Sequence, residues 1–423
     1  MEVAARRKRR RQAQDVIGVL DVGTSKTVCV IAVVSGLREG GAALAGVQVL
    51  GIGDKPTRGL TDGVVTELDG AEQAVRAAVM QAERMAGVVL EDVHLAVACR
   101  GLRSSTFTAS SEVEGRLVDD DDIDRLLEAG RTYAERDGRA LLHMNCISYR
   151  LDDAAEIGDP RGLAGTKLAA DLHTVTVKHA PLQNLLQVIE RAYLSAASLA
   201  PAPLASGLAA TTEEERQLGV VCIDIGAGTT AVSLFAQGHL LWNDLVPGGG
   251  GNITTDIARA LAVPALDAER IKRERGTLAR TGTEDDAATF DAPAGSLPVS
   301  QRAAMSEVRD VVRGRLVVHL RHVAQRIKGS GVAPYAGQRI VLAGGASLQP
   351  GLRELAAEVF ARPVRVARLE PLPGMLGEFC NPAYATATGL LHLALDPGVR
   401  RRRSGSKPAG YLGRVGQWLS ESF

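Results

Sequence analysis

The chain has 423 residues, of which 45% are hydrophobic and 23% are charged, and its formal net charge is zero. This composition indicates a globular protein with apolar cores and roughly two to four domains. A neutral body excludes a protein whose whole surface binds nucleic acid. The five cysteines are scattered and form no CxxC pair, which favours a reducing compartment over a disulfide framework or a zinc site.

Basic residues gather near both ends of the chain, at 6–11 and at 400–403. Each run by itself is consistent with a solvated, disordered terminus, and we assign no role to the first, which lies within 1–14. The chain contains no run of about 18 apolar residues, so we expect no membrane-spanning helix.

Two hairpins with the same turn pattern stand far apart in the chain. Residues 16–35 predict two β-strands joined by the turn DVGTSKT at 21–27, and residues 219–242 predict two strands joined by DIGAGTT at 224–230. Their separation is too long for a solenoid repeat. It therefore predicts two similar halves, each of which begins with the same hairpin.

Between the two hairpins we expect a helix over 70–85, a segment of different texture over 93–173, and a helix over 181–196. The acidic run 119–122 lies at a predicted helix start, where carboxylates are stabilised by the helix dipole. We therefore interpret this run as a solvated first turn rather than a metal site. The segment 201–207, rich in proline and small residues, predicts a connection between the two halves.

The second half predicts mainly helices separated by glycine turns. The expected elements are, in order, a glycine turn and a helix with Asn252 as its N-cap, a short helix over 266–276, a loop over 276–301, a long helix whose apolar residues from Met305 to Ile327 recur every three or four positions, a strand, glycine turn and helix start over 339–352, and a helix near 385–395.

The two hairpin turns each combine a carboxylate, glycine and small hydroxyl residues. Glycine allows backbone N–H groups to point inward, and the hydroxyls add donors, so such a turn can cradle phosphate oxygens. The carboxylate can hold Mg²⁺, which then bridges to phosphate. A single copy would more simply be a hairpin with a glycine turn. Two copies, at the start of two halves, favour a polyphosphate clamped from both sides.

Two further features suit a nucleoside. The sequence LAGGAS at 342–347 follows a predicted strand and precedes a helix, so its backbone can approach a ligand closely. Glu269 and Lys272 share a helix face and could bind a ribose, although a solvated ion pair is the simpler interpretation. The chain contains neither GxxxxGK[ST] nor GxGxxG, which excludes a P-loop and a dinucleotide fingerprint.

The order of these turns resembles the superfamily of actin, heat-shock chaperones and sugar kinases, and within it the FtsA family of actin-like bacterial cell-division proteins. The resemblance covers about 15–423, and its more specific stretches are GIGDKPTRGLTDGVV at 51–65, ERDGRALLHMNCISY at 135–149, GLAGTKLAADLHTVTV at 162–177, TEEERQLGVVCIDIG at 212–226 and DAERIKRERG at 267–276. It implies an α/β, actin-like two-lobed ATPase fold with duplicated halves, an inserted subdomain in the first half and a C-terminal amphipathic helix.

The resemblance also implies a set of site residues and cofactors. The phosphate and metal site would consist of Asp21, Gly23, Thr24, Ser25, Lys26, Asp224, Gly226, Gly228, Thr229 and Thr230. The adenosine site would consist of Glu269, Lys272, Gly344, Gly345 and Ser347. The cofactors would be ATP and Mg²⁺, and no catalytic residue is identified. Ala227 departs from the family pattern, in which glycine is common, but it still fits a tight turn.

The resemblance divides the chain into subdomains with separate roles. These are a first nucleotide-binding subdomain at 15–92 and 174–212, an inserted subdomain at 93–173 for polymer and partner contacts, a second nucleotide-binding subdomain at 213–260 and 338–396, a smaller subdomain at 261–337 that receives the C-terminal peptide of FtsZ, a basic linker at 397–410 and an amphipathic helix at 411–423.

The last residues of the chain form an apolar stripe at helical spacing. Its members are Leu412, Val415, Leu419 and Phe423, flanked by Trp418. By itself the stripe is suited to dock on its own domain, on a partner or on a membrane surface. The resemblance favours an anionic membrane surface, with the basic linker supplying most of the electrostatic attraction.

The resemblance thus implies a nucleotide-gated scaffold with at most slow ATPase activity and no nucleic-acid partner. It would form filaments, anchor the FtsZ ring to the cytoplasmic face of the bacterial inner membrane at the division site, and recruit later division proteins. One alternative is a small-molecule, sugar-type kinase, but no Asp or His stands out as its catalytic base. The other is a type IV pilus actin-like adaptor, which the inserted segment, the tail and the length disfavour.

Overall fold

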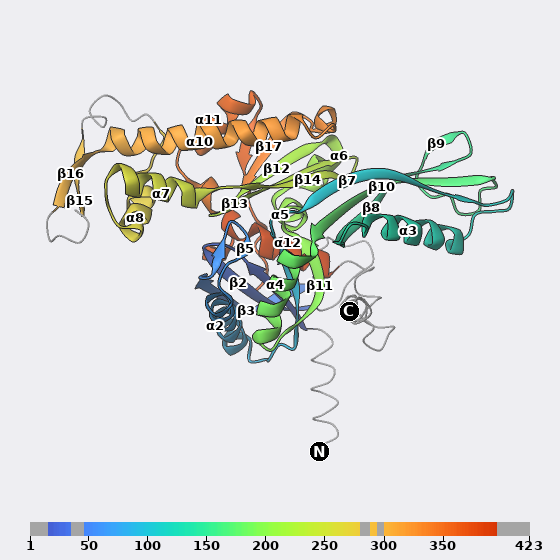
Figure 1. Ribbon diagram of the computed structural model, residues 1–423, viewed down its shortest axis with the longest axis horizontal. Helices are drawn as coiled ribbons and strands as arrows, with labels where there is room; N and C mark the ends of the chain where they lie inside the picture. Colours follow the sequence, from blue (N-terminus) through green and yellow to red (C-terminus); the bar gives the residue numbers. More distant parts are fainter. Residues whose placement is uncertain (1–15, 35–45, 280–287, 294–299, 396–423) are drawn as a thin grey trace, which may run out of the picture.

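The computed structural model describes residues 16–34, 46–279, 288–293 and 300–395 (Figure 1). The basic N-terminus, the basic linker and the predicted membrane-binding residues of the tail, which are Leu412, Val415, Trp418, Leu419 and Phe423, lie outside these ranges. Among the described residues, no helix combines the length and apolar character that crossing a bilayer requires.

Two five-stranded sheets share one topology. In the first, with order β11–β6–β1–β2–β3, β1 pairs antiparallel with β2 and parallel with β6. In the second, with order β14–β13–β12–β17–β18, β12 pairs antiparallel with β13 and parallel with β17. The strands are β1 Val16–Val22, β2 Lys26–Val34, β3 Val47–Pro56, β6 Asp92–Val97, β11 Ser195–Pro201, β12 Val220–Ile225, β13 Thr229–Ala236, β14 His239–Pro247, β17 Arg339–Ala343 and β18 Val364–Val366. The predicted duplication is confirmed.

Helices cover the sheets because their small and aliphatic residues repeat at helical spacing. On the first sheet lie α2 Leu68–Ala86 and α4 His179–Arg191. On the second lie α7 Gly250–Ala260, α8 Ala265–Arg275, α10 Met305–Lys328 and α11 Leu352–Phe360. Between the two sheets lie α5 Ala202–Ala210 and α12 Ala385–Ala394 (Figure 1). The predicted long helix, α10, runs along the upper edge of Figure 1 and ends before Gly329.

The connection that the sequence predicts at 201–207 is helical, because α5 follows β11 of the first half and precedes α6 and β12 of the second. The helix α5 is built from small and apolar residues, and all but two of its nine positions are buried. Because every side of it is buried, the helix carries no amphipathic pattern that would reveal it in the sequence. It packs so tightly on α12 that a Cβ atom added to Gly389 would lie 1.7 Å from the Ala205 carbonyl oxygen.

The inserted domain projects from the first half to the right of Figure 1. It consists of the sheet β7–β10–β8–β9 and the helix α3, with β7 at Arg103–Glu112, β8 at Arg139–Leu151, β9 at Ala154–Ile157, β10 at Lys167–Lys178 and α3 at Asp120–Ala134. Alternate residues of β10, from Leu168 to Leu172, pack against α3. This gives the insertion a hydrophobic core of its own.

The acidic run at the start of α3 is only partly the solvated turn that the sequence predicts. Asp119 is the N-cap, and its carboxylate accepts from the Asp122 N–H at 3.0 Å. Asp122 is fully buried and pairs with Arg116 at 2.5 Å and with Arg125. The run therefore caps a helix and contributes a buried carboxylate that pairs with two exposed arginines. The described residues contain no group of three metal-ligating side chains.

The second half contains two further departures from the sequence prediction. The N-cap of α7 is Gly249, and Asn252 lies three residues into the helix, where its Oδ1 accepts from the Gly249 N–H at 2.9 Å. Part of the predicted loop 276–301 is a hairpin, with β15 at Thr289–Pro293 and β16 at Ser300–Ala304. Its polar, proline-containing strands have no alternating apolar pattern, which is why the sequence did not reveal them.

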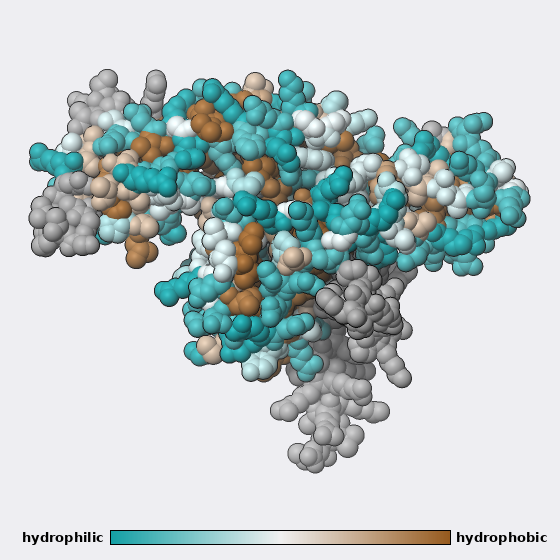
Figure 2. Space-filling model, viewed as in Figure 1, coloured by the Kyte–Doolittle hydropathy of each residue, from teal (hydrophilic) through white to brown (hydrophobic). Residues whose placement is uncertain are grey.

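Smaller elements complete the two lobes. They are β4 Leu60–Thr61, β5 Val64–Val65, α6 Glu213–Leu218, and the single-turn helices η1 Ala333–Tyr335, η2 Gly345–Leu348, η3 Gly377–Phe379 and η4 Pro382–Tyr384. Figure 2 shows one face of the molecule as largely hydrophilic, with hydrophobic residues in small, separate groups. The buried apolar residues form clusters within the layers of the two lobes.

Candidate functional site

The two predicted phosphate turns have the same geometry. The Gly23 N–H donates to the Lys26 carbonyl at 3.0 Å, and the Gly226 N–H donates to the Thr229 carbonyl at 2.9 Å. In both hairpins the aspartate lies on the first strand, two residues before the glycine. The repeated sequence therefore folds into a repeated turn.

The two turns meet across the boundary between the halves. A Cβ atom added to Gly228 would lie 2.7 Å from the Thr24 Oγ1 and 3.1 Å from the Asp62 nitrogen. The Gly63 N–H also approaches the Thr24 Oγ1, at 3.4 Å. A side chain at position 228 would therefore have to displace Thr24 and press on the backbone at Asp62. Two segments that are distant in sequence thus face each other, as the duplication predicts.

Asp21 and Asp224 bring two carboxylates into this cleft. Burial, followed by the charge of Asp224, raises the pKa of Asp21 to about 7, and the charge of Lys26 opposes this shift. Burial raises the pKa of Asp224 to about 6, against hydrogen bonds from Ser206 and Thr386 and the charge of Lys26. The protein alone therefore compensates the negative charge of each carboxylate poorly. A bound cation would stabilise the ionised form of both carboxylates.

The remaining predicted residues of the two turns differ in position. Lys26 lies beside Asp54, with 3.8 Å between its Nζ and the Asp54 Oδ2. Ser25 is exposed, and Thr229 is partly exposed. Thr230 is fully buried, and its hydroxyl donates to the Gly248 carbonyl at 2.9 Å and lies 2.7 Å from the His319 Nε2. The Thr230 side chain thus links the second turn to α10.

A second glycine loop, at 248–251, is hydrogen-bonded to the second turn. The N–H groups of Gly248, Gly250 and Gly251 donate to the carbonyls of Gly228, Gly226 and Ala227 at 2.8, 2.9 and 2.8 Å. The Ala227 carbonyl therefore accepts a hydrogen bond from this loop. The Ala227 backbone is not in the left-handed region, so its side chain is tolerated at this position. The sequence showed a glycine turn at 248–251, but only the structure places it against the phosphate turn.

The predicted adenosine residues come from two segments, the turn 344–347 that begins η2 and the helix α8. Gly344 has φ 81° and lies so close to Asp224 that an added Cβ atom would be 2.3 Å from its Oδ1. Ser347 is buried, and its hydroxyl donates to the Gly344 carbonyl at 2.7 Å. Gly345 begins the single turn η2 that follows. The turn at 344–347 therefore lies in direct contact with the second phosphate turn.

Glu269 and Lys272 are an ion pair, with 2.6 Å between Nζ and Oε2, but the pair is not simply solvated. The Lys272 ammonium also donates to the Thr254 hydroxyl at 2.9 Å and to the Gly250 carbonyl at 3.1 Å. The Glu269 carboxylate accepts from the Thr254 hydroxyl at 2.5 Å. The two side chains thus bind α8 to the start of α7.

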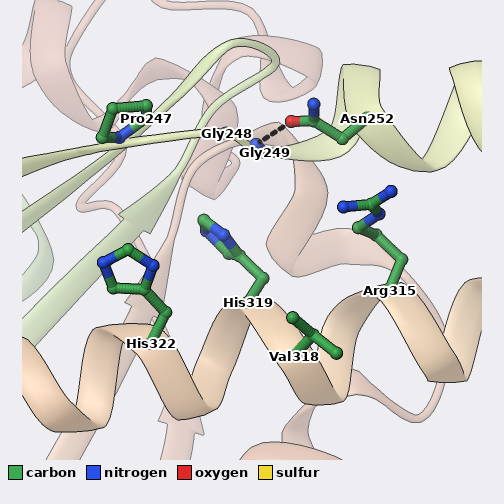
Figure 3. A pocket seen from close by; sticks show the side chains of 8 residues that line it. All are labelled: Pro247, Gly248, Gly249, Asn252, Arg315, Val318, His319 and His322. Carbon is green, nitrogen blue, oxygen red and sulfur yellow. Dashed lines mark hydrogen bonds between the residues drawn. The ribbon is translucent and has the colours of Figure 1, made fainter.

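A pocket of about 170 Å³ lies between the second glycine loop and α10 (Figure 3). It is lined by Pro247, Gly248, Gly249, Asn252, Arg315, Val318, His319 and His322. Burial, followed by the charges of His322 and Arg315, lowers the pKa of His319 to about 4. His319 is therefore neutral at physiological pH and can keep its contact with Thr230.

The sequence analysis assigned no role in the cleft to Thr386, Tyr384 or Asp54. Thr386, on α12, donates to the Asp224 Oδ2 at 3.2 Å. Tyr384 lies over Lys26, with 3.3 Å between the ammonium and the ring centroid, and donates to the Asp54 Oδ2 at 2.6 Å. Their positions depend on tertiary packing, and a threonine or tyrosine near a helix start carries no local signal of such a role.

The fold is shared with solved structures of actin-like proteins. The "PilM-PilN type IV pilus biogenesis complex" matches with a TM-score of 0.64 and 18% identity over 90% of this chain and 99% of that chain. The structure of MreB5 of Spiroplasma citri bound to ADP matches with a TM-score of 0.53 and 13% identity over 93% of this chain and 99% of that chain. At these identities the matches establish the fold, and the chain is an actin-like α/β protein.

Sequence comparisons identify the family within that fold. The family model "Cell division protein FtsA" matches residues 221–389, and the model "SHS2 domain inserted in FTSA" matches residues 100–176. FtsA of Agrobacterium fabrum is 36% identical over 96% of this chain and 95% of its own length. FtsA of Neisseria meningitidis is 31% identical over 97% of this chain and 100% of its own length. The chain belongs to the FtsA family of cell-division proteins.

This membership decides between the functions that the sequence left open. The protein is an actin-like cell-division protein, and the comparisons do not favour the sugar-type kinase or the pilus adaptor. The FtsA resemblance and the actin-like fold predicted from the sequence, including its inserted domain, are confirmed.

The electrostatics of the cleft generate a stability prediction. Between pH 4 and pH 7, folded Asp21 retains a proton that the unfolded chain has released, so the free energy of unfolding falls as pH rises. We expect Asp21→Asn, in protein freed of metal and nucleotide, to be more stable than wild type by about 1 to 3 kcal/mol near pH 8 and by less near pH 4.5. Thermal or urea unfolding at both pH values measures the difference.

The matched control for Asp21→Asn is Asp121→Asn, which removes an exposed carboxylate from the first turn of α3. The control should show no gain that grows with pH. An Asp21→Asn protein that is less stable than wild type near pH 8 would contradict the interpretation of the pair.

Proposed function

We propose that the cleft binds one Mg·ATP between the two glycine turns. The observation that carries this proposal is the close approach of two equivalent turns, each with an aspartate of raised pKa, across the boundary between the halves. The residues fit the cofactor, because glycine turns present N–H groups to phosphate and oxygen ligands suit Mg²⁺. The solved actin-like relative from Spiroplasma citri is described as bound to ADP, which supports the same assignment.

Each part of the cleft takes a separate part of the ligand. The first turn (Asp21, Gly23, Thr24, Ser25 and Lys26) and the second turn (Asp224, Gly226, Gly228, Thr229 and Thr230) would surround the phosphates and the metal. Backbone groups of Gly344, Gly345 and Ser347, together with Glu269 and Lys272, would surround the adenosine. The metal supplies the positive charge that the aspartate pair lacks, and phosphate and water oxygens complete its coordination.

The proposed cellular role is a nucleotide-gated scaffold. The protein would form filaments, carry the FtsZ ring at the cytoplasmic face of the bacterial inner membrane at the division site, and recruit later division proteins. We propose the segments 93–173 and 261–337 for these contacts. The sheet of the inserted domain and the β15–β16 hairpin lie at opposite ends of the molecule in Figure 1. Any ATPase activity would be slow.

The surface proposed for the FtsZ C-terminal peptide lies on the smaller subdomain at 261–337. Three arginines of α10 are already paired within the protein, namely Arg313 with Glu358, Arg315 with Asp256 and Arg326 with Asp244. Arg321 is exposed, and Val318 one turn earlier is 64% exposed. Together these two residues offer a cation and an apolar anchor to a short acidic and apolar peptide.

The proposed membrane attachment rests on the sequence of the tail. The four stripe residues and Trp418 would contribute roughly 1 kcal/mol each on partial burial, and Arg400 to Arg403 up to about 1 kcal/mol each near anionic lipid. Ordering about twelve helical residues opposes this by roughly 1 kcal/mol per residue. The ordering cost offsets the gain and exceeds it by roughly 3 kcal/mol or more, so one tail would bind weakly. Several tails on a filament would bind tightly, because each attachment after the first is intramolecular.

Nucleotide binding is tested by filling the gap between the turns. Gly228→Val would push against Thr24 and Asp62, and we expect it to weaken Mg·ATP binding by roughly tenfold to a hundredfold in isothermal titration calorimetry. The matched control is Gly314→Ala, because a Cβ atom at position 314 would meet nothing within 4 Å. Unchanged affinity in a folded Gly228→Val protein would refute the clamp.

Peptide binding is tested at the exposed part of α10. Arg321→Glu reverses the charge beside Val318, and we expect it to weaken binding of the FtsZ C-terminal peptide by roughly tenfold in fluorescence anisotropy, and more at low salt. The control is Arg84→Glu, which reverses an exposed charge on α2 in the other lobe. If both variants bind the peptide like wild type, the surface is wrongly assigned.

Membrane attachment is tested by removing the tail. Truncation after Val399 should abolish co-sedimentation with anionic liposomes and leave Mg·ATP affinity intact, and Trp418→Glu should do nearly the same because it places a charge at the lipid boundary. Binding by wild type should weaken with salt, more steeply for monomers than for filaments. A truncated protein that still sediments with the liposomes would show that another surface binds lipid.

A further inference from the structure

The segment Pro382–Thr386 contacts all three turns of the cleft. The Pro382 carbonyl accepts from the Gly344 N–H of the predicted adenosine turn at 2.9 Å. The Tyr384 ring lies against Lys26 of the first turn, and the Thr386 hydroxyl donates to Asp224 of the second turn. Five consecutive residues near the end of the described chain therefore connect parts of both halves.

Tyr384 has the most specific of these contacts. The Lys26 Nζ lies 3.3 Å from the centroid of its ring, and its hydroxyl donates to the Asp54 Oδ2 at 2.6 Å. The ring of Phe379 packs edge-on against that of Tyr384, with 5.0 Å between the centroids. The ring is thus fixed by an aromatic neighbour and by a hydrogen bond to β3 of the first sheet.

This arrangement restricts a side chain that is otherwise flexible. A lysine has a long stem with several rotatable bonds, and its ammonium samples many positions unless neighbours hold it. The ring face attracts the ammonium through a cation–π interaction. The Asp54 carboxylate is 3.8 Å from the Nζ, so the ion pair is loose, and the ammonium keeps hydrogen-bond donors for an incoming ligand.

We propose that Tyr384 is a positioning residue for the nucleotide phosphates, which holds the Lys26 ammonium at the cleft together with Asp54. This inference rests on the proposed binding of Mg·ATP. It goes beyond that binding, because it assigns a role in phosphate binding to a residue that is distant in sequence from both phosphate turns. Tyr384 acts through Lys26, so it should influence affinity only for ligands that carry phosphates.

The test measures dissociation constants of the full-length chain for Mg·ATP and for adenosine, by competition against a fluorescent ADP analogue. Tyr384→Leu removes ring and hydroxyl, and it should weaken Mg·ATP binding about tenfold; Tyr384→Phe keeps the ring and should weaken it about threefold. The affinity for adenosine should change less than about twofold in both variants. The control is Tyr335→Leu, which alters a tyrosine that is exposed on η1.

The same substitution in a Lys26→Met background separates positioning from packing. If Tyr384 acts through the ammonium, Tyr384→Leu should cause less than about a twofold further loss there. A tenfold loss that persists without Lys26, or an equal loss for adenosine, would show a packing role and overturn the inference. Should Tyr384→Leu fail to fold, Tyr384→Phe in the two backgrounds decides.

Failure of the inference is distinguishable from failure of the proposed function. A wild-type protein that binds no nucleotide overturns both. A wild-type protein that binds Mg·ATP, with Tyr384 variants that bind it equally well, overturns the inference alone.

Discussion

The cleft depends on two carboxylates whose charges the fold brings together. Asp21 and Asp224 occupy equivalent positions in two equivalent hairpins, and burial together with the neighbouring carboxylate raises the pKa of Asp21 to about 7. Such an arrangement is unfavourable for the folded chain by itself. Strongly perturbed carboxylates in a cleft are typical of functional sites, and here the metal ion of a metal–nucleotide complex would compensate their charge. The surrounding glycines make room for it.

The position of the two carboxylates is set by the layer between the sheets. Each hairpin belongs to a different sheet, and α5 and α12 pack between the two sheets. The two helices lie so close together that no side chain fits at Gly389. Tyr384 immediately precedes α12 and contacts Lys26 of the first turn. Thr386, on α12, donates to Asp224. A change in the spacing of the two turns would therefore have to move α12 relative to α5. The contact between Thr230 and His319 extends this connection to α10.

The sequence predicted the features that rest on local patterns. The repeated hairpins were visible because the same residues recur in the same order, and α10 was visible because its apolar residues from Met305 to Ile327 follow a helical period. The helix α5 was missed because it is apolar on all sides and therefore has no period to detect. The hairpin of β15 and β16 was missed because its strands do not alternate polar and apolar residues.

For the candidate site, too, the sequence predicted the residues that belong to local patterns and missed those placed by tertiary packing. The two turns each contain their own pattern, so their residues could be named, and the structure brings the turns together. The helix N-cap was assigned to Asn252 on residue type, whereas the glycine before the helix takes that position because its backbone must approach the second turn. Tyr384, Asp54 and Thr386 were missed because contacts between distant segments depend on packing that no local pattern encodes.

The central claim is that both halves grip one metal–nucleotide complex through Asp21 and Asp224. The most direct test is electron paramagnetic resonance with Mn²⁺ in place of Mg²⁺, which counts the metal ions bound per chain. We expect one tightly bound Mn²⁺ per chain when ATP or ADP is present, and binding at least about tenfold weaker without nucleotide. The nucleotide-dependent ion should be lost when both aspartates are replaced by asparagine. No nucleotide-dependent Mn²⁺, or an unchanged ion in the doubly substituted protein, would contradict it.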